Sequence, residues 1–489
     1  MTRNNITIAI LAILIVVLCW LCYIGRPLIE GRYVPSMAKL LTSLDSTDVG
    51  DEILTHYLRR VESDTVYRIG PARGLTPENK EKVFFLILRR MFVALVALVG
   101  FITVAALFLI NGVGRQTPVS KTRVAITVAL IILAGTIIRL VLAAAAFGNF
   151  DMDSYEIVIG IAHRGVNVYA ETERYNYSPV WLMILIVLKR IQIAMHDVPF
   201  HFIVRSFLCC VDLLTLGVLL LIARVKKLPV TRTAIFFYLS PVSFLVTGYH
   251  GQFENFAILM VLTGILMYLV LAARPVLRTV LLWLFATAGM IIKHNVFYEL
   301  IICLNSSIKR YWIKLSLFII SVIVFLLLFI PYWKTGSKGI IEHVFEYGSF
   351  SGAYGVTSLF ALPHLKYLFI AAMFIFPLFL KSKDIIAQCL LGMLFFLTFT
   401  TGFAAQYFVL PVALGAVRPS KFLLFYTLAA SVLFLGNDNI TAIPGFHLLK
   451  LNVVWVAVIC WFISEMRLDR QANGVAAKRL DYCERDEKK

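Results

Sequence analysis

The stretch VAITVALIILAGTIIRLVLAAAAF, residues 124–147, decides the fold of this chain. It has the length that a helix needs to cross the hydrocarbon core of a bilayer, and similar apolar runs recur along all 489 residues. The chain is 60% hydrophobic and 15% charged, whereas a soluble domain carries about 25% charged residues. Because the apolar runs are continuous and do not alternate with polar residues, the sequence predicts an all-α, polytopic helical membrane protein.

The basic residues of the chain predict its topology. The net charge is +18, but the lysines and arginines cluster in short connectors between apolar runs, such as residues 224–227 and 309–314. Connectors of this kind lie on the cytoplasmic side of a membrane. We therefore expect a lipid bilayer and no nucleic acid as partner, with 12–14 crossings, a cytoplasmic N-terminus and multi-pass insertion in the cell membrane.

Polar segments between the apolar runs divide the chain into three parts. Residues 1–122 hold two leading helices and an extracytoplasmic insert (25–83), which carries one amphipathic helix at 53–61. Residues 123–435 form the main transmembrane module. Residues 436–489 hold the last transmembrane helix and a charged cytoplasmic tail. The insert has balanced charge, unlike the basic connectors, and this favours the extracytoplasmic side.

Two segments of the main module allow more than one topology. Residues 177–194 are apolar, but a crossing there would move the basic residues 224–227 outside, so we predict a helix lying on the membrane surface. Residues 278–303 could cross once or fold as a hairpin with Lys293 near its outer tip. The hairpin keeps Lys309 and Arg310 inside, and we favour it.

Two carboxylates follow the run at 124–147. Asp151 and Asp153 are two residues apart, so in an extended loop they point the same way, whereas on a helix they do not. The alternation of charge places them on the extracytoplasmic side. They act as a general base and its helper, or bind a metal or hydroxyl groups; otherwise they are solvated residues at the end of a helix, or Asp153 caps a helix starting at Ser154.

Further polar residues occur in apolar surroundings. Arg205 and Asp212 share one face of a helix, seven residues apart. Arg205 can hold a phosphate or reach lipid headgroups. Asp212 lies deep, where a carboxylate needs a cation, and Lys293 is a candidate partner. Lys293 in turn needs an anion, which is either Asp212 or a ligand phosphate.

The segment 249–255 is more polar than a turn requires, and it suits sugar hydroxyls or a lipid phosphate. From these segments we expect a set of substrate-binding residues: Tyr155, Arg205, Tyr249, His250, Gln252, Glu254, Lys293 and His294. No Walker loop, HExxH zinc pattern, Rossmann fingerprint or GxSxG elbow occurs, which argues against soluble nucleotide-driven chemistry.

Together these segments resemble the glycosyltransferase type C superfamily, in particular GPI mannosyltransferase-like enzymes and their prokaryotic relatives. The resemblance covers about residues 123–435. It rests on loose motifs whose order and sidedness agree: Phe150-Asp151-Met152-Asp153-Ser154-Tyr155, Gly165-Val166-Asn167-Val168-Tyr169, Tyr175-Asn176-Tyr177-Ser178-Pro179, Arg205 with Asp212, Ser240-Pro241 before His250-Gly251-Gln252-Phe253, and Ala405-Gln406-Tyr407-Phe408. Some relatives have His-Glu where this chain has Ala404-Ala405, so no catalytic role is carried to those positions.

The resemblance implies transfer of a hexose such as mannose from a polyprenyl-phosphate sugar donor to a glycan or glycolipid acceptor of the cell envelope, with inversion at the anomeric carbon. It also implies a catalytic aspartate in the outer loop. We assign Asp151 as the base and Asp153 as a residue that orients the acceptor or a divalent cation such as Mg²⁺ or Mn²⁺; the two roles could be exchanged. Whether a divalent cation takes part stays open, because Arg205 and Lys293 alone can stabilise the phosphate of such a donor.

Two other classes of function compete with this prediction. A flippase or transporter of lipid-linked sugars would concentrate its polar residues at the middle of the bilayer and often shows internal repeats. In this chain the polar residues gather on the outer side, and only Asp212 lies clearly deep. A structural or assembly protein would not explain the acidic pair. The sequence therefore favours the glycosyltransferase.

Overall fold

The computed structural model describes residues 3–30, 77–111, 120–145, 150–196, 198–346, 354–359, 364–380, 382, 384–436 and 446–486. Within these ranges the chain is helical and has no strand. Six of the described helices are long and apolar enough to cross a membrane, or eight if each of two bent pairs is one span. The chain is thus a polytopic helical membrane protein. Five shorter apolar helices of 10–17 residues coincide with further apolar runs of the sequence. The helix expected at 53–61 lies outside the described residues.

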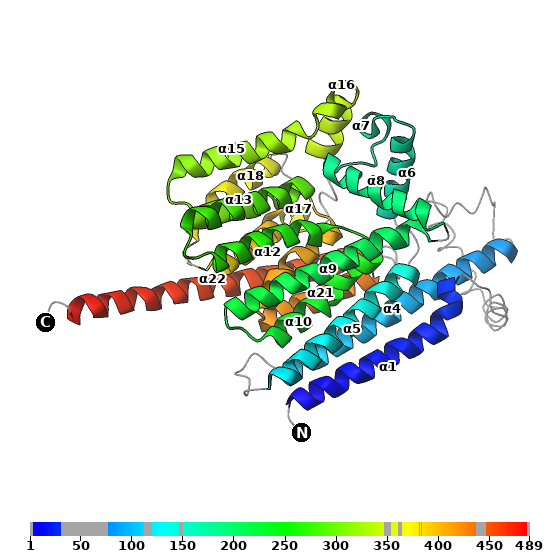
Figure 1. Cartoon of the computed structure of the whole chain (residues 1–489), viewed down its shortest axis with the longest axis horizontal. Helices are drawn as coiled ribbons and strands as arrows, with labels where there is room; N and C mark the ends of the chain where they lie inside the picture. The colour runs from blue at the N-terminus through cyan, green and yellow to red at the C-terminus, as the bar shows by residue number, and fades with distance from the viewer. Residues whose placement is uncertain are drawn as a thin grey trace.

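The leading helices pack directly on the main module. The first bundle consists of α1 (Arg3–Glu30), α4 (Pro77–Asn111), α5 (Lys121–Ala145), α9 (Phe200–Val225) and α10 (Val230–Tyr238). Helix α1 contacts α4 and α5, and α5 also contacts α9 and α10. In Figure 1 these helices lie nearly parallel, with the N-terminus at one end of the bundle. We call this end the N-terminal end.

Three further helices gather with α16 at the opposite end of the bundle (Figure 1). They are α6 (Phe150–His163), α7 (Val168–Glu171) and α8 (Pro179–Ala194), and α16 spans Ile330–Gly339. We call this end the α6 end. Helix α8 has 16 residues and leaves a stripe of exposed apolar side chains, including Met183 and Val187, which are 56% and 54% exposed. A short helix with such a face suits the membrane surface.

The remaining helices complete the bundle. They are α11 (Pro241–Phe244), η1 (Leu245–His250), α12 (Glu254–Val270), α13 (Pro275–Ile292), η2 (His294–Val296), α14 (Phe297–Ser307), α15 (Tyr311–Leu327), η3 (Ile340–Phe345), α17 (Val356–Leu359), α18 (Leu365–Ile375), η4 (Phe376–Phe379), α19 (Ile385–Phe399), η5 (Ala405–Val409), α20 (Leu410–Val417), α21 (Lys421–Gly436) and α22 (Phe446–Asp486). The predicted last crossing and the predicted tail form one continuous helix, α22, which extends beyond the bundle in Figure 1.

The predicted hairpin at 278–303 agrees with the structure. Helix α13 ends at Ile292, and α14 packs back on it after the short η2. On α13, Trp283 Nε1 donates to Ser321 Oγ of α15 at 2.9 Å, and Thr287 one turn later bonds the same hydroxyl at 2.7 Å. Trp283 Nε1 also donates to the carbonyl of Leu317. Helices α13 and α15 therefore run in the same direction, so α14 between them must return.

A buried ion pair joins the helices around Asp212. Arg139 Nε on α5 donates to Asp212 Oδ2 on α9 at 2.8 Å, and both side chains are fully buried. Asp212 also accepts hydrogen bonds from Thr247 at 2.8 Å and from Asn255 at 2.6 Å. Arg139 donates further to the carbonyl of Tyr238 at 2.6 Å. Lys293, the candidate partner from the sequence, does not pair with Asp212, because Arg139 supplies the cation.

A second charge network lies where α9, α19, α20 and α22 meet. Asp384 accepts from Lys226 Nζ at 2.9 Å and from Arg418 Nη1 at 3.3 Å. Arg418 Nη2 also contacts Glu465 on α22 at 3.2 Å, and Glu465 is buried. These contacts attach α22 to the bundle at the start of the segment that the sequence predicted to be a charged cytoplasmic tail.

Candidate functional site

The acidic pair lies on a helix. The structure places Asp151 and Asp153 in the first turn of α6, which begins at Phe150, so of the arrangements left open by the sequence, neither the extended loop nor a helix starting at Ser154 is present. Carboxylates in the first turn stabilise a helix because they complement its dipole. Two residues along a helix correspond to a rotation of about 200°, so the two carboxylates leave α6 on different sides. The geometry does not favour joint action on one ligand.

Asp151 lies beside His250. Its Oδ2 atom is 3.4 Å from His250 Nδ1, and the two side chains are 21% and 15% exposed. Asp153 is only 2% exposed. His250 ends the π-helical segment η1, and the segment from Pro241 to His250 is bent by 46° relative to α10. Of the two aspartates, Asp151 is the one that a molecule entering the site can reach.

Gly251 permits the close approach of η1 and α6. Its φ of +74° is left-handed, a conformation that favours glycine. A Cβ atom at this position would lie 2.4 Å from Met152 Cε and 3.6 Å from Arg205 Cγ. Arg205 itself is fully buried. The glycine therefore brings three expected site segments, on α6, α9 and η1, into contact.

Lys293 occupies a buried cage. Its Nζ atom is 2.7 Å from Glu254 Oε1, and the two side chains are 4% and 0% exposed. Nζ also donates to Gln252 Oε1 at 3.4 Å, and it lies over the rings of Phe253 and Tyr177 at 4.2 and 4.6 Å from their centroids. The partner anion that the sequence required is thus Glu254. Cation–π contacts with two rings add to the stabilisation of the ammonium group.

An aromatic cluster connects this cage with α6. Tyr155 of α6 lies 6.3 Å from the Tyr177 ring and 5.6 Å from the Trp181 ring, and Trp181 stacks on Phe253 at 4.0 Å. Burial raises the pKa of the Tyr155 hydroxyl well above its usual range, and the negative charges of Asp151 and Glu254 raise it further. Tyr155 therefore remains neutral in the field of both carboxylates.

Most of the expected substrate-binding residues meet at this place. Asp151, Tyr155, Arg205, His250, Gln252, Glu254 and Lys293 lie in one connected group at the α6 end. His294 is not part of it, because its ring faces Phe325 of α15 at 6.3 Å. Tyr249 is 8% exposed and belongs to the buried core. Trp181 also belongs to this group and was missed from the sequence, although a tryptophan two residues after Pro179 was a visible signal.

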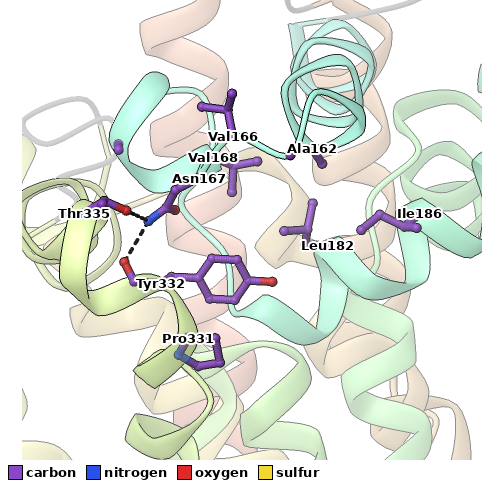
Figure 2. Close-up of a pocket in the computed structure, with 11 residues that line it drawn as sticks. Ala162, Val166, Asn167, Val168, Leu182, Ile186, Pro331, Tyr332 and Thr335 are labelled. Atoms are coloured by element: carbon purple, nitrogen blue, oxygen red, sulfur yellow. Dashed lines mark hydrogen bonds between the residues drawn. The ribbon is translucent and has the colours of Figure 1, made fainter.

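Four residues of the expected motif, Gly165 to Val168, line a separate cavity of about 580 Å³ (Figure 2). Asn167 Nδ2 donates to the Tyr332 carbonyl at 2.7 Å and to Thr335 Oγ1 at 2.8 Å, which joins the segment to α16. Figure 2 shows the Tyr332 ring reaching across the cavity toward Leu182. The volume is within the range of small-molecule sites.

The described residues offer little to a divalent cation. In that part of the chain, no group of three or more His, Cys, Asp or Glu side chains comes together. Asp151 and Asp153 leave α6 on different sides, as described above, so they do not form one ligand set. We therefore derive no step through a metal ion.

Comparisons with known proteins do not assign this site. No family model, no curated protein and no solved structure matches the chain. The resemblance to type C glycosyltransferases accordingly stays a prediction from the sequence motifs.

Proposed function

We propose that this protein is an integral membrane glycosyltransferase that moves a sugar from a polyprenyl-phosphate donor to a hydroxyl group of a glycan or glycolipid acceptor. One observation carries the proposal. The reachable Asp151–His250 pair lies beside a buried cluster that contains two cations, Arg205 and Lys293, and an aromatic wall. A base next to a phosphate-binding region and a stacking surface is what sugar transfer from a lipid phosphate requires.

Asp151 acts as the general base. The acceptor hydroxyl loses its proton to the Asp151 carboxylate while its oxygen forms a bond to C1 of the donor sugar. The bond from C1 to the phosphate oxygen breaks at the same time, and the polyprenyl phosphate leaves with the electron pair, so C1 is inverted. His250 holds the carboxylate through its Nδ1 contact of 3.4 Å. A base must come within hydrogen-bond reach of the proton that it accepts, and Asp151, which is 21% exposed, is more accessible than Asp153, which is 2% exposed.

Lys293 and Arg205 stabilise the leaving phosphate. The Lys293 ammonium has three N–H groups, and Glu254 and Gln252 accept two of them. The third can donate to a phosphate oxygen, while Glu254 fixes the position of the ammonium group beforehand. Such preorganised charge is effective in a site from which water is excluded. The rings of Tyr177 and Phe253 beside Lys293 form an apolar wall for the sugar or the isoprenoid.

The cavity of Figure 2 is suited to part of the acceptor. It is lined by Ala162 near the end of α6, eleven residues after Asp151. At 1.5 Å per residue the two ends are about 16 Å apart, so donor and acceptor can be bound together. Both regions lie at the α6 end, which the charge pattern predicts to be extracytoplasmic. We place the reaction on that side of the cell membrane.

Matched aspartate variants test the proposal. We expect Asp151→Asn to lower sugar transfer by about 10²–10⁴-fold, because the amide cannot accept the proton. Asp153→Asn is the control on the same helical turn, and it retains most of the activity if it inserts and folds. Full transfer by Asp151→Asn would refute the assignment of the base. Movement of lipid-linked sugar across the bilayer without any transfer would instead favour a flippase.

A further inference from the structure

A groove that faces the lipid lies at the other end of the bundle. Helices α14, α15 and α18 with η4 enclose a cavity of about 270 Å³. Several of its lining side chains are open to the surroundings, including Leu378 at 67% and Ile375 at 51% exposure, and Phe318 and Phe374 form its aromatic wall. Helix α15 with the segment after it is apolar enough for a bent membrane span, and α18 with η4 is one of the shorter apolar helices, so the exposed apolar side chains of the groove suit contact with lipid chains.

Two consecutive hydrogen bonds hold the ammonium group of Lys314 at this groove. Asn305 Nδ2 donates to the Pro377 carbonyl at 2.8 Å, which fixes the amide between α14 and η4. The Asn305 oxygen accepts from Lys314 Nζ at 2.7 Å. This leaves two N–H groups of the ammonium for another acceptor. No carboxylate is among the groove residues that the structure describes, and the ion pairs found in that part of the chain do not include Lys314.

The surroundings of Lys314 add positive charge at the level of the headgroups. Lys309 and Arg310 precede α15 and are exposed, and Tyr311, which lines the groove, is 63% exposed. Aromatic side chains of this kind mark the interface between membrane and water. The groove lies at the N-terminal end, since α13 and α15 start there, and the charge pattern predicts this end to be cytoplasmic. Basic pockets between helices on that side bind anionic headgroups.

We propose that this groove binds an anionic phospholipid of the cytoplasmic leaflet. The lipid phosphate accepts hydrogen bonds from Lys314, and the first part of an acyl chain lies along Phe318, Phe374 and Leu378. Asn305 is a positioning residue that directs the ammonium group into the groove. The inference does not depend on the proposed sugar transfer, because the two sites are at opposite ends of the bundle.

Native mass spectrometry of the purified full-length protein tests this site. Phosphatidylglycerol and phosphatidylcholine with identical acyl chains are titrated separately. We expect phosphatidylglycerol to bind about tenfold more tightly, since a charge-assisted hydrogen bond favours it. Lys314→Gln removes this preference and Lys314→Arg retains it. Lys338→Gln is the control at the α6 end, where Lys338 is 85% exposed, and it changes nothing.

Several outcomes would overturn the inference. Equal binding of the two lipids by the unmodified protein excludes selection of an anionic headgroup, and a preference that survives Lys314→Gln excludes this groove. Polyprenyl phosphate could instead displace phosphatidylglycerol from the unmodified protein. If Lys314→Gln abolishes this displacement, the groove binds polyprenyl phosphate and the inference is wrong. If Lys314→Gln does not fold, Ile375→Trp provides the second test. Its indole fills the lipid-facing groove, and it must weaken the binding of phosphatidylglycerol.

Discussion

Removal of either member of the Arg139–Asp212 pair should destabilise the membrane domain strongly. The two side chains are fully buried at 2.8 Å, and Asp212 accepts further bonds from Thr247 and Asn255. Asp212→Leu leaves the Arg139 guanidinium without its counter-charge inside the bundle. Loss of one partner of a buried pair costs about 3–5 kcal/mol, because the remaining charge stays desolvated.

The double variant separates charge from packing. Arg139→Met with Asp212→Leu removes both charges and retains most of the volume, so we expect a cost below about 2 kcal/mol. The free energy of unfolding is measured by reversible denaturation in mixed micelles for the two single variants and the double variant. The exposed pair Lys338–Glu342 is the control, because its loss costs less than about 1 kcal/mol.

The unfolding free energies of the three variants decide whether the uncompensated charge causes the loss of stability. A double variant that is less stable than either single variant would refute the reasoning, since the two losses would then add. Single variants that cost less than 1 kcal/mol would also refute it. They would show that water or another residue compensates for the missing partner.

Three further predictions concern other parts of the molecule. Gly251→Ala should cost about 1–3 kcal/mol of stability and lower sugar transfer, because the left-handed φ of +74° strains alanine and its methyl group would displace the end of the Met152 side chain; equal stability and activity would contradict this. Asp384→Asn should cost about 1 kcal/mol at low salt and less at high salt, because its two cationic partners are partly exposed; a cost independent of salt would contradict it. The raised pKa of Tyr155 means that the folded protein keeps this hydroxyl protonated at pH 10.0, the ordinary tyrosine value, while the unfolded chain ionises it. The corresponding stability is complete below pH 10 and is lost as the pH rises toward the folded-state pKa. Tyrosinate absorbance of the native protein and of Tyr155→Phe should therefore coincide at pH 10 and differ only after denaturation.

The transmembrane architecture could be predicted from the sequence, because hydrophobic length is a local property. The run at 124–147 became α5, and the hairpin at 278–303 followed from the need to keep Lys309 and Arg310 on the basic side. The start of α6 could not be predicted with the same rule. Two acidic residues after an apolar run suit a loop as well as the first turn of a helix, and packing against η1 decides between them.

The partners of the buried charges required the tertiary structure. Arg139 is visible in the sequence as a cation inside an apolar run, but 73 residues separate it from Asp212. Lys293, Arg205 and Glu254 were equally available as partners by composition. Only the packing of α5 on α9 shows that Arg139 pairs with Asp212, and only the packing of α12 on α13 shows that Lys293 pairs with Glu254. The stacking of Trp181 on Phe253 also required the tertiary structure, because a contact between rings on different helices leaves no pattern in the sequence.

The central claim is that Asp151 removes the proton of an acceptor hydroxyl during sugar transfer from a lipid phosphate. The most direct measurement uses the purified protein in proteoliposomes with radiolabelled polyprenyl-phosphate hexoses and pentoses. At least one donor should transfer its sugar to a glycan or glycolipid acceptor with the unmodified protein and with Asp153→Asn, but not with Asp151→Asn. Transfer that is unaffected in Asp151→Asn would contradict the account, as would transport of these donors without any glycosidic product.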